Sequence, residues 1–144
     1  MGSGSASPKH WRRRNDATPC IGRRYHVPMA THRDLKVWQL AQQLAAGVYE
    51  LTRGAAAAQM PNLVEQIRRS ALSIGANIAE GRALGSNAQF KRHLSIALGS
   101  AAETDSHLDA LLSAGVVDAL QALELRDTTA TVQRMLIALQ RKIG

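Results

Sequence analysis

Four polar side chains in the middle of the sequence are the first candidates for a catalytic site: Arg69, Asn77, Glu80 and Glu103. Glu65 precedes Arg69 by four residues, the spacing of an ion pair on one helix, which contributes only about 0.2–0.5 kcal/mol when exposed. Arg69 and Glu80 point the same way on a helix but lie three turns apart, so each needs a partner on another helix or subunit. We interpret the four residues as a structural polar network that fixes helix register, rather than as a catalytic set.

A carboxylate-bridged metal site is the second chemistry to consider, because helical bundles build such sites from Glu-x-x-His pairs on two helices and Glu on two others. The sequence places Glu103 four residues before His107, and both face away from the apolar side of their helix. His93 precedes His107 by 14 residues, about 21 Å along a helix, so the two imidazoles cannot share an ion. We predict no metal ligands.

Nucleophilic and cofactor chemistry have equally little support in the sequence. The single cysteine, Cys20, lies in the N-terminal segment, and no serine stands in a Gly-x-Ser-x-Gly turn. The stretch from Gly81 to Gly85 lacks the Lys-Ser/Thr ending of a phosphate-binding loop. We therefore predict a protein that is not an enzyme and binds no cofactor. One cysteine excludes an internal disulfide and is typical of a cytoplasmic protein.

A basic cluster is the remaining candidate site. It flanks the expected turn between the second and third helices and consists of Arg68, Arg69, Arg82, Lys91 and Arg92. Repeated around a ring of subunits, these side chains would form a rim that contacts the phosphates of RNA or DNA. The alternative is an ordinary solvated helix end, where charged residues are common.

The elements that must position these residues are helices, because apolar residues recur three and four apart from residue 34 onward. Capping residues, one proline and three glycines divide this region into four helices. The expected boundaries are Asp34 and Gly54, Pro61 and Gly81, Ser86 and Gly115, and Asp118 and the chain end. Four such helices with short links predict an all-α fold, an antiparallel up-down four-helix bundle.

Each predicted helix has one apolar row that is expected to face the core. The rows are Trp38, Ala41, Ala45 and Val48; Val64, Ile67, Ala71, Ile74 and Ile78; Phe90, Leu94, Ala97, Ala101, Thr104, Leu108 and Leu111; and Leu125, Thr129, Val132, Leu136, Leu139 and Ile143.

The third helix also carries a row of small residues, formed by Ser95, Gly99, Ala102 and Ser106. A glycine inside a helix costs about 1 kcal/mol relative to alanine, so Gly99 and Gly75 call for a packing explanation. One explanation is contact with a second subunit along this row, which makes it a predicted oligomer interface. The alternative is close packing of helices inside one subunit.

The sequence has 144 residues and a formal net charge of +7, enough for one domain. Residues 1–28 carry six basic and one acidic side chain, so most of the excess belongs to a basic leader over residues 1–30, which we expect to be disordered. The leader is either a nucleic-acid-binding arm or a segment preceding a true start at Met29. Residues 31–144 form the bundle domain. No apolar stretch reaches the roughly 20 residues of a membrane span.

Four groups of residues occur in one order and resemble a known family. They are Asp34-Leu-Lys-Val-Trp38, Gln66-Ile-Arg-Arg69, Ser73-Ile74 with Asn77-Ile-Ala-Glu-Gly81, and Leu94-Ser-Ile-Ala97 with Gly99-Ser100 and Glu103. Together they look like the four-helix bundle protein family also called 23S rRNA intervening sequence proteins. The resemblance covers residues 32–143. Departures from the family pattern are Ala55–Ala58, where the family often has Phe-Pro and acidic residues, and Gly75, where it often has proline.

The resemblance implies a homopentamer of four-helix subunits without known catalysis. A related branch, the accessory protein of diversity-generating retroelements, forms a basic pentamer that binds nucleic acid and a reverse transcriptase. We therefore predict a non-enzymatic, homo-oligomeric adaptor whose partner is RNA, DNA or another protein. The alternative is a structural or protein-binding oligomer with no role in nucleic-acid binding.

Overall fold

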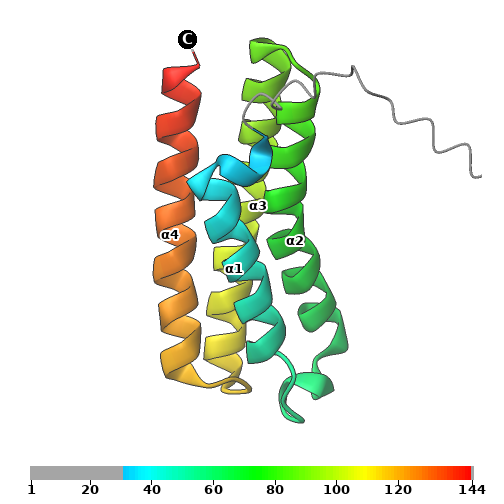
Figure 1. Ribbon diagram of the computed structural model, residues 1–144. Coiled ribbons are helices and arrows are strands. Elements are labelled where there is room, and N and C mark those ends of the chain that lie inside the picture. Colours follow the sequence, from blue (N-terminus) through cyan, green and yellow to red (C-terminus); the bar gives the residue numbers. More distant parts are fainter. Residues whose placement is uncertain (1–30, 144) are drawn as a thin grey trace, which may run out of the picture.

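The computed structural model of the chain describes residues 31–143, which form four long helices and two short 3-10 turns (Figure 1). The expectations for residues 1–30 and for Gly144 lie outside the described residues. The elements are η1 (His32–Asp34), α1 (Lys36–Leu51), η2 (Ala57–Gln59), α2 (Pro61–Ala83), α3 (Asn87–Ala114) and α4 (Ala119–Lys142). The predicted all-α, four-helix architecture is confirmed.

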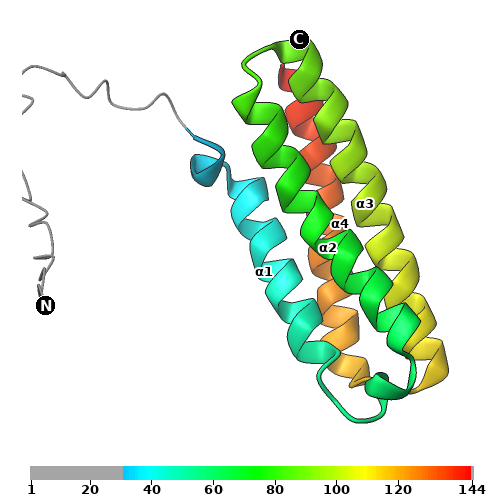
Figure 2. The same cartoon turned by 90° about the vertical axis from the view of Figure 1, so that its right-hand side faces the viewer.

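The four helices lie side by side, and consecutive helices are neighbours. In Figure 1 the chain runs down α1, up α2, down α3 and up α4. Figure 2 shows α2 between α1 and α3, with α4 behind. The most extensive interface joins α2 to α3, while α4 packs against α3 and α1 and closes the bundle. Among residues 31–143, no helix combines the length and hydropathy needed to cross a bilayer.

Local capping chemistry sets most of the helix ends where the sequence places them. Pro61 occupies the first turn of α2, where its missing N–H costs nothing. Ser86 Oγ accepts a hydrogen bond from the Gln89 amide at 3.1 Å at the start of α3. Asp118 does the same for the Gln121 amide at 2.8 Å at the start of α4. These boundary predictions are confirmed.

The predicted start of the first helix is wrong. Asp34 belongs to η1, and its carboxylate accepts a hydrogen bond from the Thr31 amide at 2.7 Å, while Thr31 Oγ1 accepts one from the Arg33 amide. Leu35 occupies the N-cap position of α1 and makes no side-chain cap. Asp34 is a capping residue as expected, but it caps the 3-10 turn η1 and not α1.

Two predicted helix ends are displaced in the structure. Gly81 does not stop the second helix, because α2 continues to Ala83 and the left-handed Gly85 follows it. Gly81 is buried, and a Cβ on it would lie 2.6 Å from the His93 Cβ. The glycine therefore permits the close approach of α2 and α3. The first helix ends at Leu51, before Gly54.

The apolar rows meet in one continuous core. The rows of α2 and α3 are fully buried, and Thr129, Val132 and Leu136 supply the central part of α4. In α1 the register shifts slightly, since Val37 is buried and Trp38 is only half-buried against the core. Burial of this continuous apolar surface, rather than intrinsic helix propensity, is the main source of stability for such helices.

Candidate functional site

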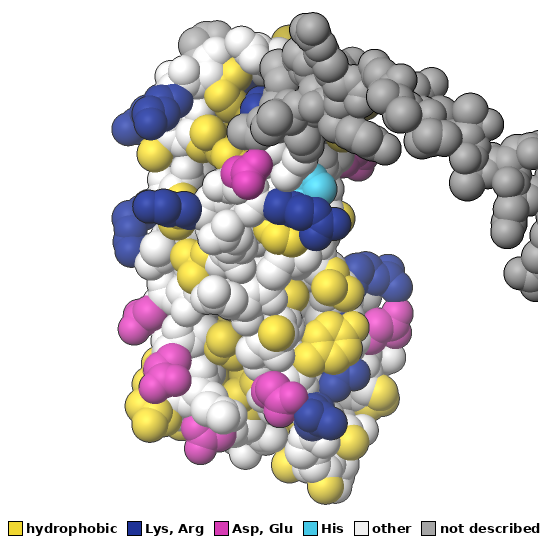
Figure 3. Space-filling view, in the orientation of Figure 1, with side chains coloured by type: hydrophobic (Ala, Val, Ile, Leu, Met, Phe, Trp, Pro, Cys, Tyr) yellow, Lys and Arg dark blue, Asp and Glu magenta, His cyan; other side chains and the backbone are white. Residues whose placement is uncertain are grey.

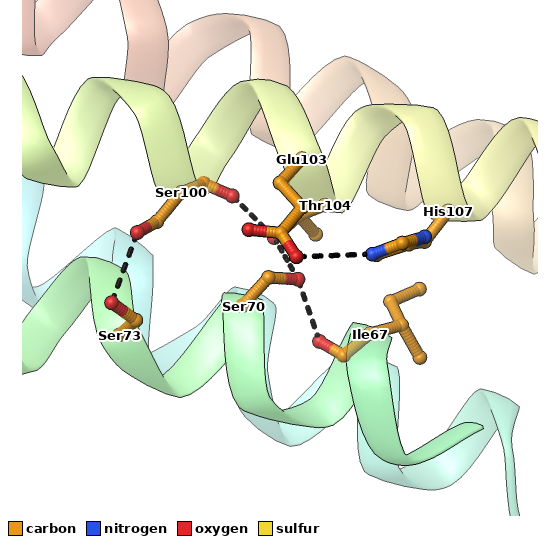
Figure 4. Close-up of polar contacts among 7 residues, drawn as sticks. All are labelled: Ile67, Ser70, Ser73, Ser100, Glu103, Thr104 and His107. Carbon is orange, nitrogen blue, oxygen red and sulfur yellow. Dashed lines mark hydrogen bonds and ion pairs between the residues drawn. The ribbon is translucent and has the colours of Figure 1, made fainter. Parts of the chain in front are cut away.

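The interface between α2 and α3 contains a row of hydroxyl groups flanking the apolar core (Figure 4). The hydroxyl of Thr104 lies 2.9 Å from both the Ser70 hydroxyl and the Ser100 carbonyl, and its proton is shared between them. Ser70 in turn donates to the Ile67 carbonyl at 3.1 Å. Nearer the α2–α3 turn, Ser73 and Ser100 bond through their hydroxyls at 2.9 Å. We call Ser70, Ser73, Ser100 and Thr104 the hydroxyl row.

Asn77 extends the hydroxyl row to His93. The Asn77 amide nitrogen donates to the carbonyl and hydroxyl of Ser73, so its oxygen faces His93 Nδ1 at 3.2 Å. In this orientation a neutral His93 must carry its proton on Nδ1 and donate it to Asn77. Glu80 lies on the exposed side, 3.9 Å from the same imidazole nitrogen. These contacts satisfy polar groups between two helices, and they leave no nucleophile beside a base.

The predicted network of Arg69, Asn77, Glu80 and Glu103 does not form as one unit. Asn77 and Glu80 do meet, but through His93 on α3. Arg69 pairs only along its own helix, with Glu65 at 2.7 Å, and Glu103 pairs along α3 with His107 at 3.3 Å. Each pair is made within one helix and does not bridge α2 and α3: the Arg69–Glu65 pair is exposed, whereas the His107 side chain is only 22% exposed.

The sequence contains a signal for the hydroxyl row that our reading of single residues missed. Ser70 and Ser73 are three residues apart beside the apolar row of α2, and Ser100 and Thr104 are four apart on α3. Each pair therefore occupies one helix side. Two such pairs on helices joined by a short turn are the pattern expected of facing hydroxyls.

The structure does not bring the five predicted nucleic-acid-binding residues together. Arg68 and Arg69 lie in the first half of α2, and Arg82 lies near its end, 14 residues and about 21 Å further along the axis. Lys91 and Arg92 stand at the start of α3, across the turn from Arg82. The prediction that Arg68 and Arg69 lie beside the α2–α3 turn is therefore wrong, because α2 continues for more than three turns after them.

Arg68 has a structural role at the opposite end of the bundle. Its guanidinium donates to the hydroxyl and the carbonyl of Thr52, at 2.9 and 3.3 Å, and lies 4.6 Å from the centre of the Tyr49 ring. Thr52 is the residue after the last turn of α1, where backbone carbonyls lack helical partners. Arg68 thus caps α1 from α2.

Two shallow grooves flank the cations near the α2–α3 turn. One, of about 320 Å³, has Arg82 and Phe90 on its walls, and the Arg82 guanidinium lies 5.9 Å from the Phe90 ring centre. The other, of about 410 Å³, runs between the start of α3 and the end of α4 and is flanked by Lys91 and Arg141. Gln140 joins these two helices by donating to the Lys91 carbonyl at 3.3 Å.

The predicted interface residues Ser95, Gly99, Ala102 and Ser106 are all exposed on α3, and Ser95 borders α4, where it accepts a hydrogen bond from Gln140 at 2.7 Å. A Cβ added to Gly99 would meet nothing within 4 Å, so packing inside the subunit does not explain this glycine. Gly75 differs, because a Cβ added to it would lie 3.1 Å from Gln42 Oε1 on α1. A contact inside the subunit is therefore present at Gly75, against the end of a flexible side chain, and absent at Gly99.

Within residues 31–143, no group of three or more His, Cys, Asp or Glu side chains is arranged to hold a metal ion. The fold and these contacts define a class: a four-helix bundle in which several polar side chains join one helix to another.

The chain belongs to the 23S rRNA-intervening sequence protein family, whose sequence model matches residues 33–138. It is similar to a solved protein of unknown function from the S23 ribosomal protein family of Bacteroides thetaiotaomicron. The two are 27% identical, the match covers 72% of this chain and 97% of the other, and the TM-score is 0.65. No curated protein matches the chain.

Proposed function

We propose that this protein is a non-enzymatic, homo-oligomeric adaptor, pentameric in its assembled form, that binds nucleic acid through cations beside the α2–α3 turn. The proposal rests first on Gly99. This residue lies in the middle of α3 on a face of small exposed side chains, and nothing in its own subunit approaches it. A glycine that costs about 1 kcal/mol in a helix is well suited to the close approach of a helix from another copy.

The binding part of the proposal rests on Arg82, Lys91 and Arg92, which approach the same turn from two helices. Equivalent turns in a ring of copies would multiply this charge, and phosphate contacts give affinity that does not depend on sequence. Arg68 and Arg69 are not part of this surface, since they lie at the other end of α2.

Self-association is tested by replacing Gly99 with a bulky residue. We expect light scattering at 150 mM salt to give a mass near five subunits for the wild type and a smaller mass for Gly99→Leu. Gly54→Leu is the matched control, because Gly54 is also exposed and has nothing within 4 Å of its Cβ position. A wild-type monomer, or a Gly99→Leu variant that keeps the wild-type mass, contradicts this interface.

A protein-binding oligomer is the second candidate, and the groove between α1 and α2 favours it. The groove has a volume of about 810 Å³, and Tyr49 and Leu72 on its walls are 40% and 47% exposed. Salt separates the two candidates. Binding to phosphates weakens steeply between 50 and 200 mM salt, whereas docking driven by apolar contacts with Tyr49 and Leu72 does not.

A further inference from the structure

The charges of the described bundle are segregated along its long axis. We define the basic half as residues 31–43, 73–100 and 131–143, which includes the α2–α3 turn and the end of α4. It carries eight Lys or Arg and two Asp or Glu side chains, a net charge of +6. The acidic half, residues 44–72 and 101–130, carries four basic and eight acidic side chains, a net charge of −4. The bundle is therefore an electric dipole with a positive end.

The space-filling view agrees with this division. On the face seen in Figure 3, the upper part of the bundle carries more Lys and Arg than Asp and Glu, while most of the Asp and Glu side chains lie on the lower part, together with several Lys or Arg. The upper part holds the start of α1 and the end of α4.

Ion pairing sharpens the contrast. In the acidic half, Arg53, Arg69 and Arg126 each lie within 3.3 Å of a carboxylate oxygen, so their charges are locally neutralised. In the basic half, the exposed Arg92 and Arg141 come from the start of α3 and the end of α4, and Arg141 borders the groove that Lys91 also lines. Their positive potential is directed to solvent.

The aromatic residues of the basic half are not available for stacking on bases. Phe90 is 6% exposed, and Trp38 is half-buried with the His32 ring against it at 4.9 Å between centres. Proteins that read unpaired bases present exposed aromatic faces to them. Among the described residues, this end offers cations without such a platform, which suits a duplex whose bases are stacked and whose phosphates face outward.

We infer that the basic half binds the phosphate backbone of a nucleic-acid duplex without sequence preference, and that the acidic half repels it. The duplex then contacts one end of each bundle, across the start of α3 and the end of α4. This inference rests on the proposed binding of nucleic acid and assigns it to one end of the molecule.

The test compares two double variants that each remove two positive charges. Arg92→Ala/Arg141→Ala alters the basic half, and Arg53→Ala/Arg69→Ala alters exposed pairs in the acidic half. Binding of a labelled 20-base-pair DNA duplex is titrated by fluorescence anisotropy between 50 and 200 mM salt, with a second duplex of permuted sequence. Light scattering and circular dichroism check that both variants keep the wild-type mass and helicity.

For the wild type we expect the two duplexes to bind equally within about twofold. The basic-half variant should bind at least about tenfold more weakly at 50 mM salt, with a log–log salt slope that is shallower by about two. The acidic-half variant should lose less than about twofold. Equal losses in both variants, or a preference for one duplex, overturn the inference while nucleic-acid binding stands. A wild type that does not bind at 50 mM salt overturns both.

Discussion

The hydroxyl of Thr104 on α3 lies 2.9 Å from the hydroxyl of Ser70 on α2, with both side chains enclosed by the core. Buried hydroxyl groups are costly unless they are bonded, and here each has a partner. An apolar contact tolerates sliding of one helix along another, whereas this bond is made at one register only. Together with the Ser73–Ser100 bond, it fixes α2 against α3.

Thr104→Val should lower the free energy of unfolding by about 1 kcal/mol, because valine keeps the volume and removes the hydrogen bond. Urea denaturation measures the loss. Thr128→Val is the matched control, since the Thr128 hydroxyl bonds only to the Glu124 carbonyl of its own helix at the surface. Equal effects of the two substitutions would show that the interhelical bond contributes nothing specific.

Adjacent arginines on α2 should differ in their effect on stability. Arg68→Ala removes the cap of α1 at Thr52 and the contact with Tyr49, so we expect a loss of about 1–2 kcal/mol. Arg69→Ala removes only the exposed pair with Glu65 and should cost less than about 0.5 kcal/mol. Thermal and urea unfolding check both values. A larger loss for Arg69→Ala would contradict the capping role of Arg68.

Two glycines of α2 should respond differently to alanine. Gly81→Ala places a methyl group 2.6 Å from the His93 Cβ, which cannot move without shifting α3, so we expect a loss of about 2 kcal/mol. At Gly75 the nearest atom is the end of the flexible, exposed Gln42 side chain, which can move aside. There the gain in helix propensity, up to about 1 kcal/mol, should offset the contact. Differential scanning calorimetry of both variants tests this order.

The link between α3 and α4 through Arg126 should depend on salt. Its guanidinium lies 3.3 Å from Asp105 and 2.9 Å from Asp109, so Arg126→Met leaves two neighbouring carboxylates without their cation. We expect a loss of about 1 kcal/mol at 20 mM salt that shrinks at 500 mM. Arg53→Met, which breaks one exposed pair with Glu50, is the control and should show little loss at either concentration. A loss independent of salt would indicate packing by the arginine stem instead.

Helix number, type and most boundaries could be predicted because they depend on local information. Pro61, Ser86 and Asp118 act on backbone groups within four residues of themselves, and the three-and-four spacing of apolar residues marks the buried side of each helix. The family motifs carry the same information in another form. None of these features requires knowledge of which helix lies beside which.

Tertiary structure decided the partners of the polar residues and the meaning of the glycines. Gly81 is expected to end a helix, yet it lies within α2. A glycine is needed there because α3 passes too close for any side chain. Arg68 and Arg82 are 14 residues apart on the same helix, and the length of α2 places them at opposite ends of the bundle, where Arg68 caps α1 and Arg82 lies beside the turn. Long-range contacts of this kind depend on the rotation and register of whole helices. A sequence pattern determines which side of a helix is apolar. Only the packing of the helices determines which residues of the neighbouring helices contact that side and the polar positions beside it.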